Sequence, residues 1–224
     1  MVRRLIDVVL SATALILIGP LVALAAIGIL LSSPGPILYR AKRVGINGTI
    51  FCMYKLRTMH VHHGEFSGSV TVRNDPRVFR FGSLLRRLKI DESLQFINIL
   101  KGEMSIVGPR PENPEIVRNY YASDHFETLS VLPGLASPGS IYNYTHGEQM
   151  LSCDNAQEYY ASQLLPIKLA LDIVYVREAS FIYDIRLIVR TVWVILCTAL
   201  GKNCFPDPPE IRKAIRLGLV PGSF

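Results

Sequence analysis

The stretch LIDVVLSATALILIGPLVALAAIGILL, residues 5–31, decides the fold of this chain. It contains about 27 residues, and Asp7 is the only charged one among them. An apolar helix of this length can cross the ~30 Å hydrocarbon core of a bilayer. The apolar core of a signal peptide is shorter, about 7–15 residues. The first segment of the chain is therefore expected to enter a membrane.

Gly19-Pro20 lies at the middle of this segment. Proline removes a backbone donor and clashes with the preceding turn, so the helix is expected to kink or break here. Each half then has roughly 11–14 residues and a length of about 20 Å, which is too short to cross a bilayer. We favour a re-entrant helix hairpin over residues 1–36 that dips into the membrane and returns, with its break at Gly19 and Pro20.

The charges on both sides of the segment agree with this path. Arg3 and Arg4 precede the segment, and the basic run Arg40–Arg43 follows it. Basic flanks favour the cytoplasmic side, and a re-entrant helix places both flanks there. A single span with a proline kink stays open, because neighbouring helices can satisfy the freed carbonyl. A buried helix of a soluble core is a third interpretation, which the length of the segment disfavours.

The composition indicates a folded protein with an anionic partner. Of the 224 residues, 50% are hydrophobic and 19% are charged, below the ~25% of soluble domains, and this composition excludes intrinsic disorder. The net charge of +6 and the pI near 9.2 favour a phosphate-bearing substrate, a phospholipid surface or nucleic acid. We expect no nucleic-acid partner, because the basic residues are not interleaved with an aromatic platform. The cysteines are too scattered for a zinc site or a disulfide scaffold, which indicates a reducing compartment: Cys52, Cys153, Cys197 and Cys204.

Beyond the first segment, turn residues and periodic apolar positions predict short elements. Apolar runs on either side of Gly45-Ile46-Asn47-Gly48 predict a β-hairpin within residues 37–59. The polar stretch 60–69 predicts a mobile loop, and its histidines are more simply explained as solvated than as metal ligands. Two short helices are expected next, one beginning at Gly82-Ser83 and one running from Asp91 to a cap at Lys101-Gly102.

The expected organisation has three parts. The re-entrant hairpin is followed by a catalytic domain on the cytoplasmic face, residues 37–201, and by a Pro-rich tail, residues 202–224, that is expected to be peripheral. Within the domain, residues 157–179 predict a helix interrupted near Pro166, and residues 181–201 predict an amphipathic helix in the membrane interface. The apolar face of that last helix is expected to contain Phe181, Ile185, Ile188, Val192, Leu196 and Leu200. The fold class is therefore α-rich α+β and membrane-associated, with one small β-hairpin and several short and interfacial helices.

The neighbouring carboxylates Asp91 and Glu92 are the strongest candidates for chemistry. Their ordinary interpretation is structural, since Asp caps helices and Glu favours the first turn. However, three cations lie within Arg86–Lys89, and Arg110 sits downstream in a rigid Pro-Arg-Pro frame. A carboxylate among cations stays ionised and can attack phosphorus to give an aspartyl phosphate. Its neighbour can help to hold a divalent metal, preferably Mg²⁺ where phosphate is the substrate.

Four runs of sequence carry a family resemblance. They are YKLRTM (54–59), RNDPR (73–77), RRLKIDESLQ (86–95) and LKGEMSIVGPRP (100–111). In these runs the chain resembles the bacterial sugar transferase family and, within it, the small monotopic polyprenyl-phosphate phosphoglycosyl transferases. The order and spacing of the runs agree with that family from Arg3 to about Leu200.

The resemblance implies a reaction and a location. Such enzymes transfer a sugar-1-phosphate from a UDP-sugar to undecaprenyl phosphate and release UMP, the first membrane step of a glycoconjugate or exopolysaccharide pathway. They act at the cytoplasmic face of the bacterial inner membrane, in contact with membrane lipids. Downstream glycosyltransferases and a second copy of the chain are further partners compatible with this resemblance.

The resemblance also implies roles for individual residues. Asp91 matches the nucleophile that forms a covalent phosphosugar intermediate, and Asp91 and Glu92 match the catalytic pair at which Mg²⁺ binds. The positions that match substrate-binding or supporting residues are Lys55, Arg57, Arg86, Arg110 and Asp172.

One region departs from the family pattern. Pro133-Gly134-Leu135 is kept, but the residues that follow, 136–140, read ASPGS, where relatives have a threonine-glycine turn and small polar residues. We therefore carry over no sugar specificity. Two alternative functions stay open: a nucleotide-sugar hydrolase with the same aspartyl chemistry, and a membrane-anchored assembly protein without enzymatic activity.

Overall fold

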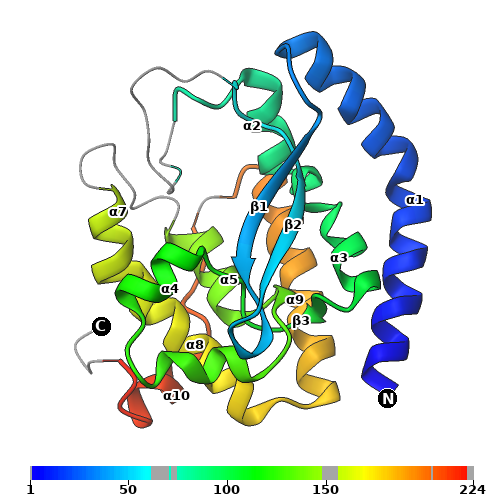
Figure 1. The fold of residues 1–224 in the computed structure, drawn as a ribbon. Helices are drawn as coiled ribbons and strands as arrows, with labels where there is room; N and C mark the ends of the chain where they lie inside the picture. The colour runs from blue at the N-terminus through cyan, green and yellow to red at the C-terminus, as the bar shows by residue number, and fades with distance from the viewer. Residues whose placement is uncertain (1, 62–70, 72–74, 148–155, 203, 221–224) are drawn as a thin grey trace.

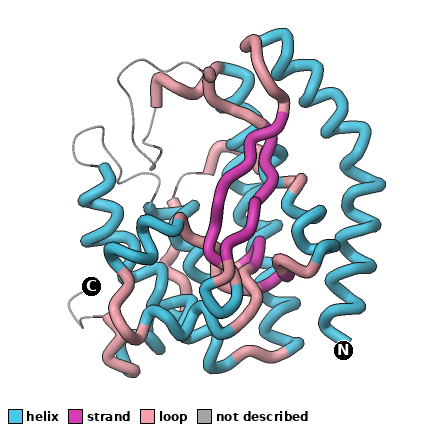
Figure 2. The backbone as a smooth tube through the Cα atoms, viewed as in Figure 1, coloured by secondary structure: helices cyan, strands magenta, loops and turns pink. Residues whose placement is uncertain are grey.

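The computed structural model describes residues 2–61, 71, 75–147, 156–202 and 204–220. Helices make up most of it, and the strands form two small two-stranded sheets (Figure 2). One sheet is an antiparallel hairpin and the other is a short parallel pair. The helix-rich fold with a small hairpin is thus confirmed in outline.

The first helix, α1 (Val2–Ser32), runs along one side of the molecule (Figure 1). It continues through Pro20 as one 31-residue helix, which Figure 1 shows curving over the top of the molecule rather than breaking into two helices. By length and composition α1 is able to cross a membrane, and only 11% of its most apolar window is buried. The predicted break at Gly19 and Pro20 is therefore wrong, because the helix accommodates Pro20 without ending there; the re-entrant path stays a prediction.

Both ends of α1 contact the same globular domain. Near its start, Arg3 donates to Asp184 at 2.7 Å, and Asp7 accepts from the Ser105 hydroxyl at 2.8 Å. Near its end, Ala25 and Ile29 are buried in a core cluster with residues of the hairpin and of the following helices. A helix held at both ends by one domain lies along that domain, with its remaining apolar face uncovered.

The predicted hairpin is confirmed. Strand β1 (Leu38–Val44) pairs with β2 (Ile50–Leu56) from Leu38 opposite Leu56 to Val44 opposite Ile50. The turn η1 (Ile46–Gly48) contains Asn47 at φ 54° and Gly48 at φ 79°. Asn and Gly are the residues that accept these left-handed conformations at least cost, so Asn-Gly in the sequence correctly located the turn. Residues 62–69 of the predicted loop lie outside the described residues.

The helices that follow differ from the prediction at one point. Helix α2 (Arg80–Arg87) begins two residues before Gly82, close to the predicted start. Asp91, however, does not begin a helix: it lies in the short 3-10 turn η2 (Ile90–Glu92), and α3 (Gln95–Lys101) starts only afterwards. The left-handed Lys89 separates η2 from α2, so the carboxylates stand on a turn rather than at a helix N-terminus. Gly102, at φ 85°, ends α3 as predicted.

The middle of the chain forms the second small sheet and several short helices. Strand β3 (Ser105–Val107) pairs in parallel with β4 (Gly134–Ala136). Between and after these strands lie α4 (Pro114–Tyr120), η3 (His125–Ser130), α5 (Pro138–Tyr142) and the π-helical turn η4 (Asn143–Gly147). Ser137 caps α5 by accepting from the backbone amide of Ser140, so the atypical ASPGS run forms a capped helix start.

The largest core cluster surrounds α8 (Leu165–Glu178). Helix α8 is preceded by α7 (Ala156–Tyr159) and the π-helical turn η5 (Tyr160–Leu164). The predicted helix is present, and the irregularity expected near Pro166 is a π-helical turn rather than a break. Most of the residues along α8 are buried, including the charged Lys168 and Asp172. A helix buried on all sides with two charges inside it must satisfy those charges with specific partners.

Helix α9 (Phe181–Ala199) leaves an apolar face uncovered, as the sequence predicted. Phe181, Ile185, Val192, Leu196 and Leu200 at the helix end are exposed. The predicted member Ile188 is instead partly buried against a core cluster, because its side of the helix faces the domain. The exposed residues also include Ile182, Val189 and Trp193.

The C-terminal segment is not peripheral. Helix α10 (Glu210–Arg216) packs Ile211 and Ala214 into the core around α8. Its buried Glu210 accepts from Arg190 at 2.9 Å and from the Tyr183 hydroxyl at 2.8 Å. The proline-rich composition concealed an apolar pair and one buried carboxylate, which attach this segment to α8 and α9.

Candidate active site

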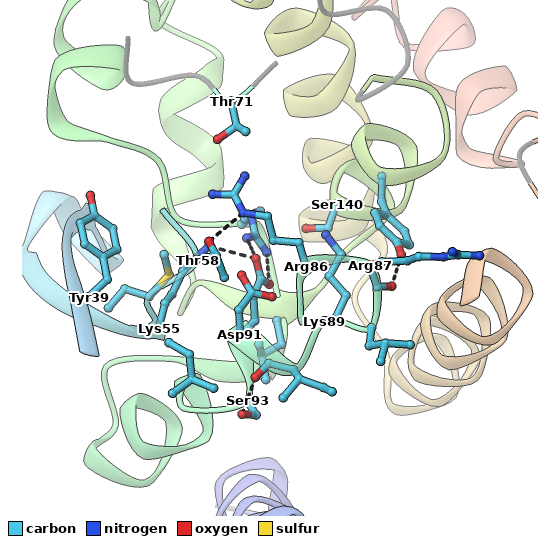
Figure 3. Close-up of a pocket in the computed structure, with 18 of the residues that line it drawn as sticks. Tyr39, Lys55, Thr58, Thr71, Arg86, Arg87, Lys89, Asp91, Ser93 and Ser140 are labelled. Atoms are coloured by element: carbon cyan, nitrogen blue, oxygen red, sulfur yellow. Dashed lines mark hydrogen bonds and ion pairs between the residues drawn. The ribbon is translucent and has the colours of Figure 1, made fainter. Parts of the chain in front are cut away.

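An open cleft of about 1640 Å³ lies between the hairpin, the α2–η2 segment, the loop after β3 and the start of α5. Figure 3 shows Lys55, Arg86, Asp91 and Ser140 gathered around it. Enclosed small-molecule sites usually measure about 300–1,000 Å³, so this open cleft has room for a large ligand. Its walls are polar near η2 and apolar where α1 and α9 approach.

The turn that carries the two carboxylates is held in a conformation of elevated energy. Lys89, just before η2, has φ 56°, a left-handed conformation that costs a non-glycine residue roughly 1–2 kcal/mol. Its ammonium lies 4.0 Å from the centre of the Tyr144 ring, and the Ser93 hydroxyl closes the turn by donating to the Ile90 carbonyl. Such strain concentrates at functional sites, where surrounding contacts enforce it.

Glu92 is the saturated member of the pair. Arg110 grips its carboxylate with two guanidinium nitrogens, of which Nη1 lies 3.0 Å from Oε2, and Lys55 Nζ donates to Oε1 at 2.9 Å. Burial opposes ionisation of Glu92, but Arg110, Lys55 and Lys89 outweigh burial and hold its pKa well below the usual range. Glu92 is therefore a fixed negative charge that positions two cations.

Asp91 is the unsatisfied member. It is buried, lines the cleft, and its Oδ1 has no hydrogen-bond partner among the described residues. Burial raises the pKa of Asp91, and the charge of Glu92 adds to the rise, whereas Lys55, Lys89 and Arg86 act in the opposite direction. A buried oxygen without a partner costs about 1–3 kcal/mol, and the surroundings that hold it also leave it available for a ligand.

Arg86 reaches the same cleft from α2. Its Nε donates to Thr58 Oγ1 at 2.8 Å, so its guanidinium is oriented by the end of the hairpin (Figure 3). The approach of α2 to this strand end depends on Gly82, because a Cβ there would lie 2.3 Å from the Thr58 carbonyl oxygen. The sequence indicated that Gly82 lies at the start of a helix, and the structure shows that it also allows this helix to pack closely against Thr58.

Arg110 lies on a short loop that two backbone hydrogen bonds attach to the β4 segment. Gly108 donates to the Ala136 carbonyl, and Gly134 donates to the Pro109 carbonyl at 2.9 Å. A Cβ on Gly134 would lie 2.1 Å from the Gly108 nitrogen, so the two backbones approach as closely as they do only because Gly134 has no side chain. Arg110 follows directly, and its side chain crosses to Glu92.

Two other predicted residues have different surroundings. Arg57 is buried and lines the cleft, but it donates to the Ser33 carbonyl at 2.6 Å and the Pro36 carbonyl at 2.5 Å. Its guanidinium thus clamps the chain just beyond α1, whereas Lys55, on the same strand, reaches Glu92. Sequence reasoning could not separate these two cations, because both lie in one short basic motif.

Asp172 lies behind the cleft rather than on its lining. It is fully buried on α8 and accepts from the Gly139 backbone amide at 2.9 Å. Burial raises the pKa of Asp172 to about 6, although Lys168 and the Gly139 amide act in the opposite direction. Asp172 therefore supports the start of α5, from which Ser140 faces the cleft.

Asp91 and Glu92, the predicted catalytic dyad, can hold a magnesium ion only together with a phosphate ligand. Among the described residues no three His, Cys, Asp or Glu side chains gather as a metal cage. Asp91 Oδ1 is an available oxygen ligand, while the Glu92 oxygens are held by Arg110 and Lys55. Mg²⁺ in proteins is commonly held by one or two carboxylates plus substrate phosphates and water, and this donor set fits that arrangement.

Comparisons with known proteins agree on one family. A family profile for bacterial sugar transferases matches residues 1–198. UDP-glucose:undecaprenyl-phosphate glucose-1-phosphate transferases of Caulobacter vibrioides and Escherichia coli K12 are 35% and 34% identical over 88% and 86% of this chain. A UDP-N-acetylgalactosamine-undecaprenyl-phosphate N-acetylgalactosaminephosphotransferase of Aeromonas hydrophila is 31% identical over 87%. The matched region spans 70% of the Caulobacter protein but 40% and 44% of the other two.

Proposed function

The chain belongs to the bacterial sugar transferase family, and from this premise we propose that it transfers a sugar-1-phosphate from a UDP-sugar to undecaprenyl phosphate and releases UMP. The names of several relatives join a UDP-sugar donor to this lipid acceptor. The observation that carries the proposal is the unpartnered carboxylate oxygen of Asp91, buried in a cleft where Lys55, Lys89 and Arg86 oppose the effects of burial and of Glu92 on its pKa.

In the first half of the reaction, an oxygen of the Asp91 carboxylate attacks the phosphorus that carries the sugar. A bond forms between this oxygen and phosphorus. The bond between that phosphorus and the bridging oxygen of the diphosphate breaks, and UMP leaves with the bridging oxygen and the electron pair. The protein then carries the sugar phosphate as an aspartyl ester.

In the second half, an oxygen of undecaprenyl phosphate attacks the same phosphorus. The bond to Asp91 breaks, the carboxylate is restored, and the sugar phosphate becomes the terminal part of a lipid diphosphate. Because one cleft serves both halves in turn, the water-soluble donor and the lipid acceptor do not need to bind together.

The cations around Asp91 supply the electrostatic stabilisation that phosphoryl transfer requires. Arg86 and Lys89 come from the α2–η2 segment, and Lys55 and Arg110 are fixed by their contacts with Glu92. Charged donors fixed in advance stabilise charge that develops on phosphoryl oxygens without reorganising during the reaction. Mg²⁺, held by Asp91 and the donor's diphosphate, would neutralise part of the diphosphate charge.

We place the protein monotopically at the cytoplasmic face of a bacterial inner membrane, and its apolar helices support a position on one membrane surface. Arg3, near the start of α1, pairs with Asp184, and the residues near its end are buried in the same domain. A helix that crossed the bilayer would place one of its ends on the opposite side, away from that domain. The cleft is also lined by Ile18 of α1 and Val192 of α9, on the side where their apolar faces are exposed. A lipid phosphate arriving in the interface therefore meets the cleft directly, a feature that a nucleotide-sugar hydrolase does not need.

UMP release tests the proposal. The purified protein in detergent, with Mg²⁺, is given a panel of UDP-sugars with and without undecaprenyl phosphate. Sustained UMP release that requires the lipid and depends on one sugar supports the transferase. Sustained release without lipid establishes the hydrolase instead, and no release with any donor contradicts the proposal.

A further inference from the structure

A buried ionic cluster lies next to the dyad but is separate from it. Glu112, two residues after Arg110, forms an ion pair with Lys168 of α8, and the Tyr160 hydroxyl donates to the same carboxylate oxygen at 2.7 Å. Lys168 also donates to the Tyr160 oxygen at 3.2 Å. All three residues are buried, and all three line the inner end of the cleft.

Two carboxylates act on Arg110. It binds Glu92 directly, and Glu112, two residues further along the chain, attracts it electrostatically. Arg43 also faces Glu112 and repels Arg110. An arginine between two carboxylates takes the partner whose charge is less neutralised, so the side chain that neutralises Glu112 influences where Arg110 points.

The backbone around Arg110 leaves little other freedom. Before it, Pro109 accepts from Gly134, and after it the Glu112 carbonyl accepts from the Val44 amide of β1 at 2.9 Å. Pro111 restricts the remaining link. Because the loop is held at both ends, the orientation of Arg110 is set by its side-chain partners rather than by movement of the loop.

We propose that Lys168 is a positioning residue that neutralises Glu112 and thereby keeps Arg110 directed at Glu92 and the phosphates of the donor. Tyr160 assists by donating to the same Glu112 oxygen. Lys168 itself touches no substrate. This inference rests on the proposed function, because the phosphates that Arg110 serves are those of a nucleotide diphosphate.

A double substitution separates this role from a structural one. Lys168→Met leaves Glu112 charged and without its ammonium partner, so Glu112 captures Arg110, and kcat/KM for the UDP-sugar is expected to fall roughly 10- to 100-fold, the loss typical of a misplaced catalytic contact. Glu112→Gln combined with Lys168→Met removes both charges, and kcat/KM is expected to return to within about 5-fold of Glu112→Gln alone. Lys168 is thus required only while Glu112 is charged.

Each alternative gives another pattern. If Lys168 contacts the substrate, the double variant stays as impaired as Lys168→Met. If the pair is only structural, Lys168→Met lowers the unfolding temperature and leaves kcat/KM unchanged. Either result overturns the proposal.

A second pair of variants covers the case in which Lys168→Met does not fold. Tyr160→Phe removes one hydroxyl from Glu112 and is expected to lower kcat/KM by about 3- to 10-fold, in keeping with one lost hydrogen bond to a charged group. Tyr160→Phe with Glu112→Gln should be no worse than Glu112→Gln alone. A Tyr160→Phe loss that persists in the double variant contradicts the proposal.

Binding of UDP separates this proposal from the proposed function. Calorimetric titration with UDP and Mg²⁺ should show weaker binding to Lys168→Met and recovery in the double variant, whether or not the wild-type protein turns over any UDP-sugar. Wild-type protein that binds UDP but releases no UMP with lipid contradicts the proposed function alone. UDP affinities that are equal in wild type and Lys168→Met contradict the positioning role.

Discussion

Two buried carboxylate sites flank Arg110, and they are built in opposite ways. At the inner end of the cleft, Glu112 Oε1 has two donors, Lys168 and the Tyr160 hydroxyl. At η2, Asp91 Oδ1 has no partner among the described residues. The protein saturates the carboxylate that holds its scaffold and leaves unsatisfied the one that faces the ligand. Among the described carboxylates that line the cleft, a buried oxygen without a partner distinguishes Asp91; Asp172 Oδ2 also has no partner, but Asp172 lies behind the cleft.

Asp91→Asn gives the largest expected effect. The amide is nearly isosteric but cannot attack phosphorus, so kcat for UMP release should fall at least about 1,000-fold. The substitution also removes a buried charge, so the unfolding temperature should equal or exceed that of the wild type. Asp91→Glu, which moves the carboxylate by one methylene, should be similarly inactive. A folded Asp91→Asn protein with near-normal turnover removes Asp91 from the role of nucleophile.

Glu92→Gln should be the next most damaging change. It releases Arg110 and Lys55 from their shared anchor, and kcat/KM is expected to drop about 100-fold, the size of one lost electrostatic contact in a transition state. Because the charge of Glu92 raises the pKa of Asp91, its removal lowers that pKa. The acidic limb of the pH profile of kcat/KM should therefore move to lower pH, and a limb that moves to higher pH contradicts the electrostatic account.

Arg57→Lys tests whether Arg57 belongs to the scaffold. Lysine cannot reproduce the forked contacts with the Ser33 and Pro36 carbonyls, so unfolding free energy should fall by about 1–3 kcal/mol. The KM for the UDP-sugar should change by less than about 5-fold, since phosphate contacts are left to other cations. A large rise in KM with unchanged stability returns Arg57 to the substrate site.

Asp172→Asn should have the smallest effect on turnover. The folded pKa of about 6 lies above the ordinary value of 3.8, so the folded state binds the proton more tightly and the wild type loses stability as pH rises from about 4 to about 6. The loss is at most about 3 kcal/mol, from a shift of about two pKa units. Asn keeps an acceptor for Gly139 and should flatten this pH dependence, with UMP release within about 3-fold. Urea unfolding at pH 4.5 and 7 measures how much the unfolding free energy changes with pH. An equal change in the wild type and in Asp172→Asn contradicts the assignment.

The sequence predicted those elements whose position is determined by residues close together in the chain. Asn47-Gly48 located the hairpin turn, and Pro166 indicated the irregularity at the start of α8, where a π-helical turn precedes the helix. The family resemblance assembled Asp91, Glu92 and Arg110, which the structure brings together although Glu92 and Arg110 lie 18 positions apart. These positions could be inferred because each lies within a short, distinctive motif.

What the sequence did not reveal depends on long-range packing. Lys168 pairs with a residue 56 positions away, and α10 attaches through Glu210 to Arg190, 20 positions away. A lysine inside an apolar helix and a carboxylate after a proline run have no local partner to mark them. The left-handed conformation of Lys89 could not be predicted either, because lysine has no preference for it. Asp91 was expected at a helix start because the sequence gives no signal for the turn that separates η2 from α3.

The central claim is that Asp91 carries the sugar phosphate covalently. The direct measurement is the mass of the intact protein after incubation with its UDP-sugar and Mg²⁺ without undecaprenyl phosphate, followed by peptide mapping. The account predicts up to one UMP released per protein, a mass increase equal to the sugar phosphate on the peptide that contains Asp91, and loss of that increase when the lipid is added. UMP release only in the presence of lipid, with no adduct on a protein that turns over, would contradict it.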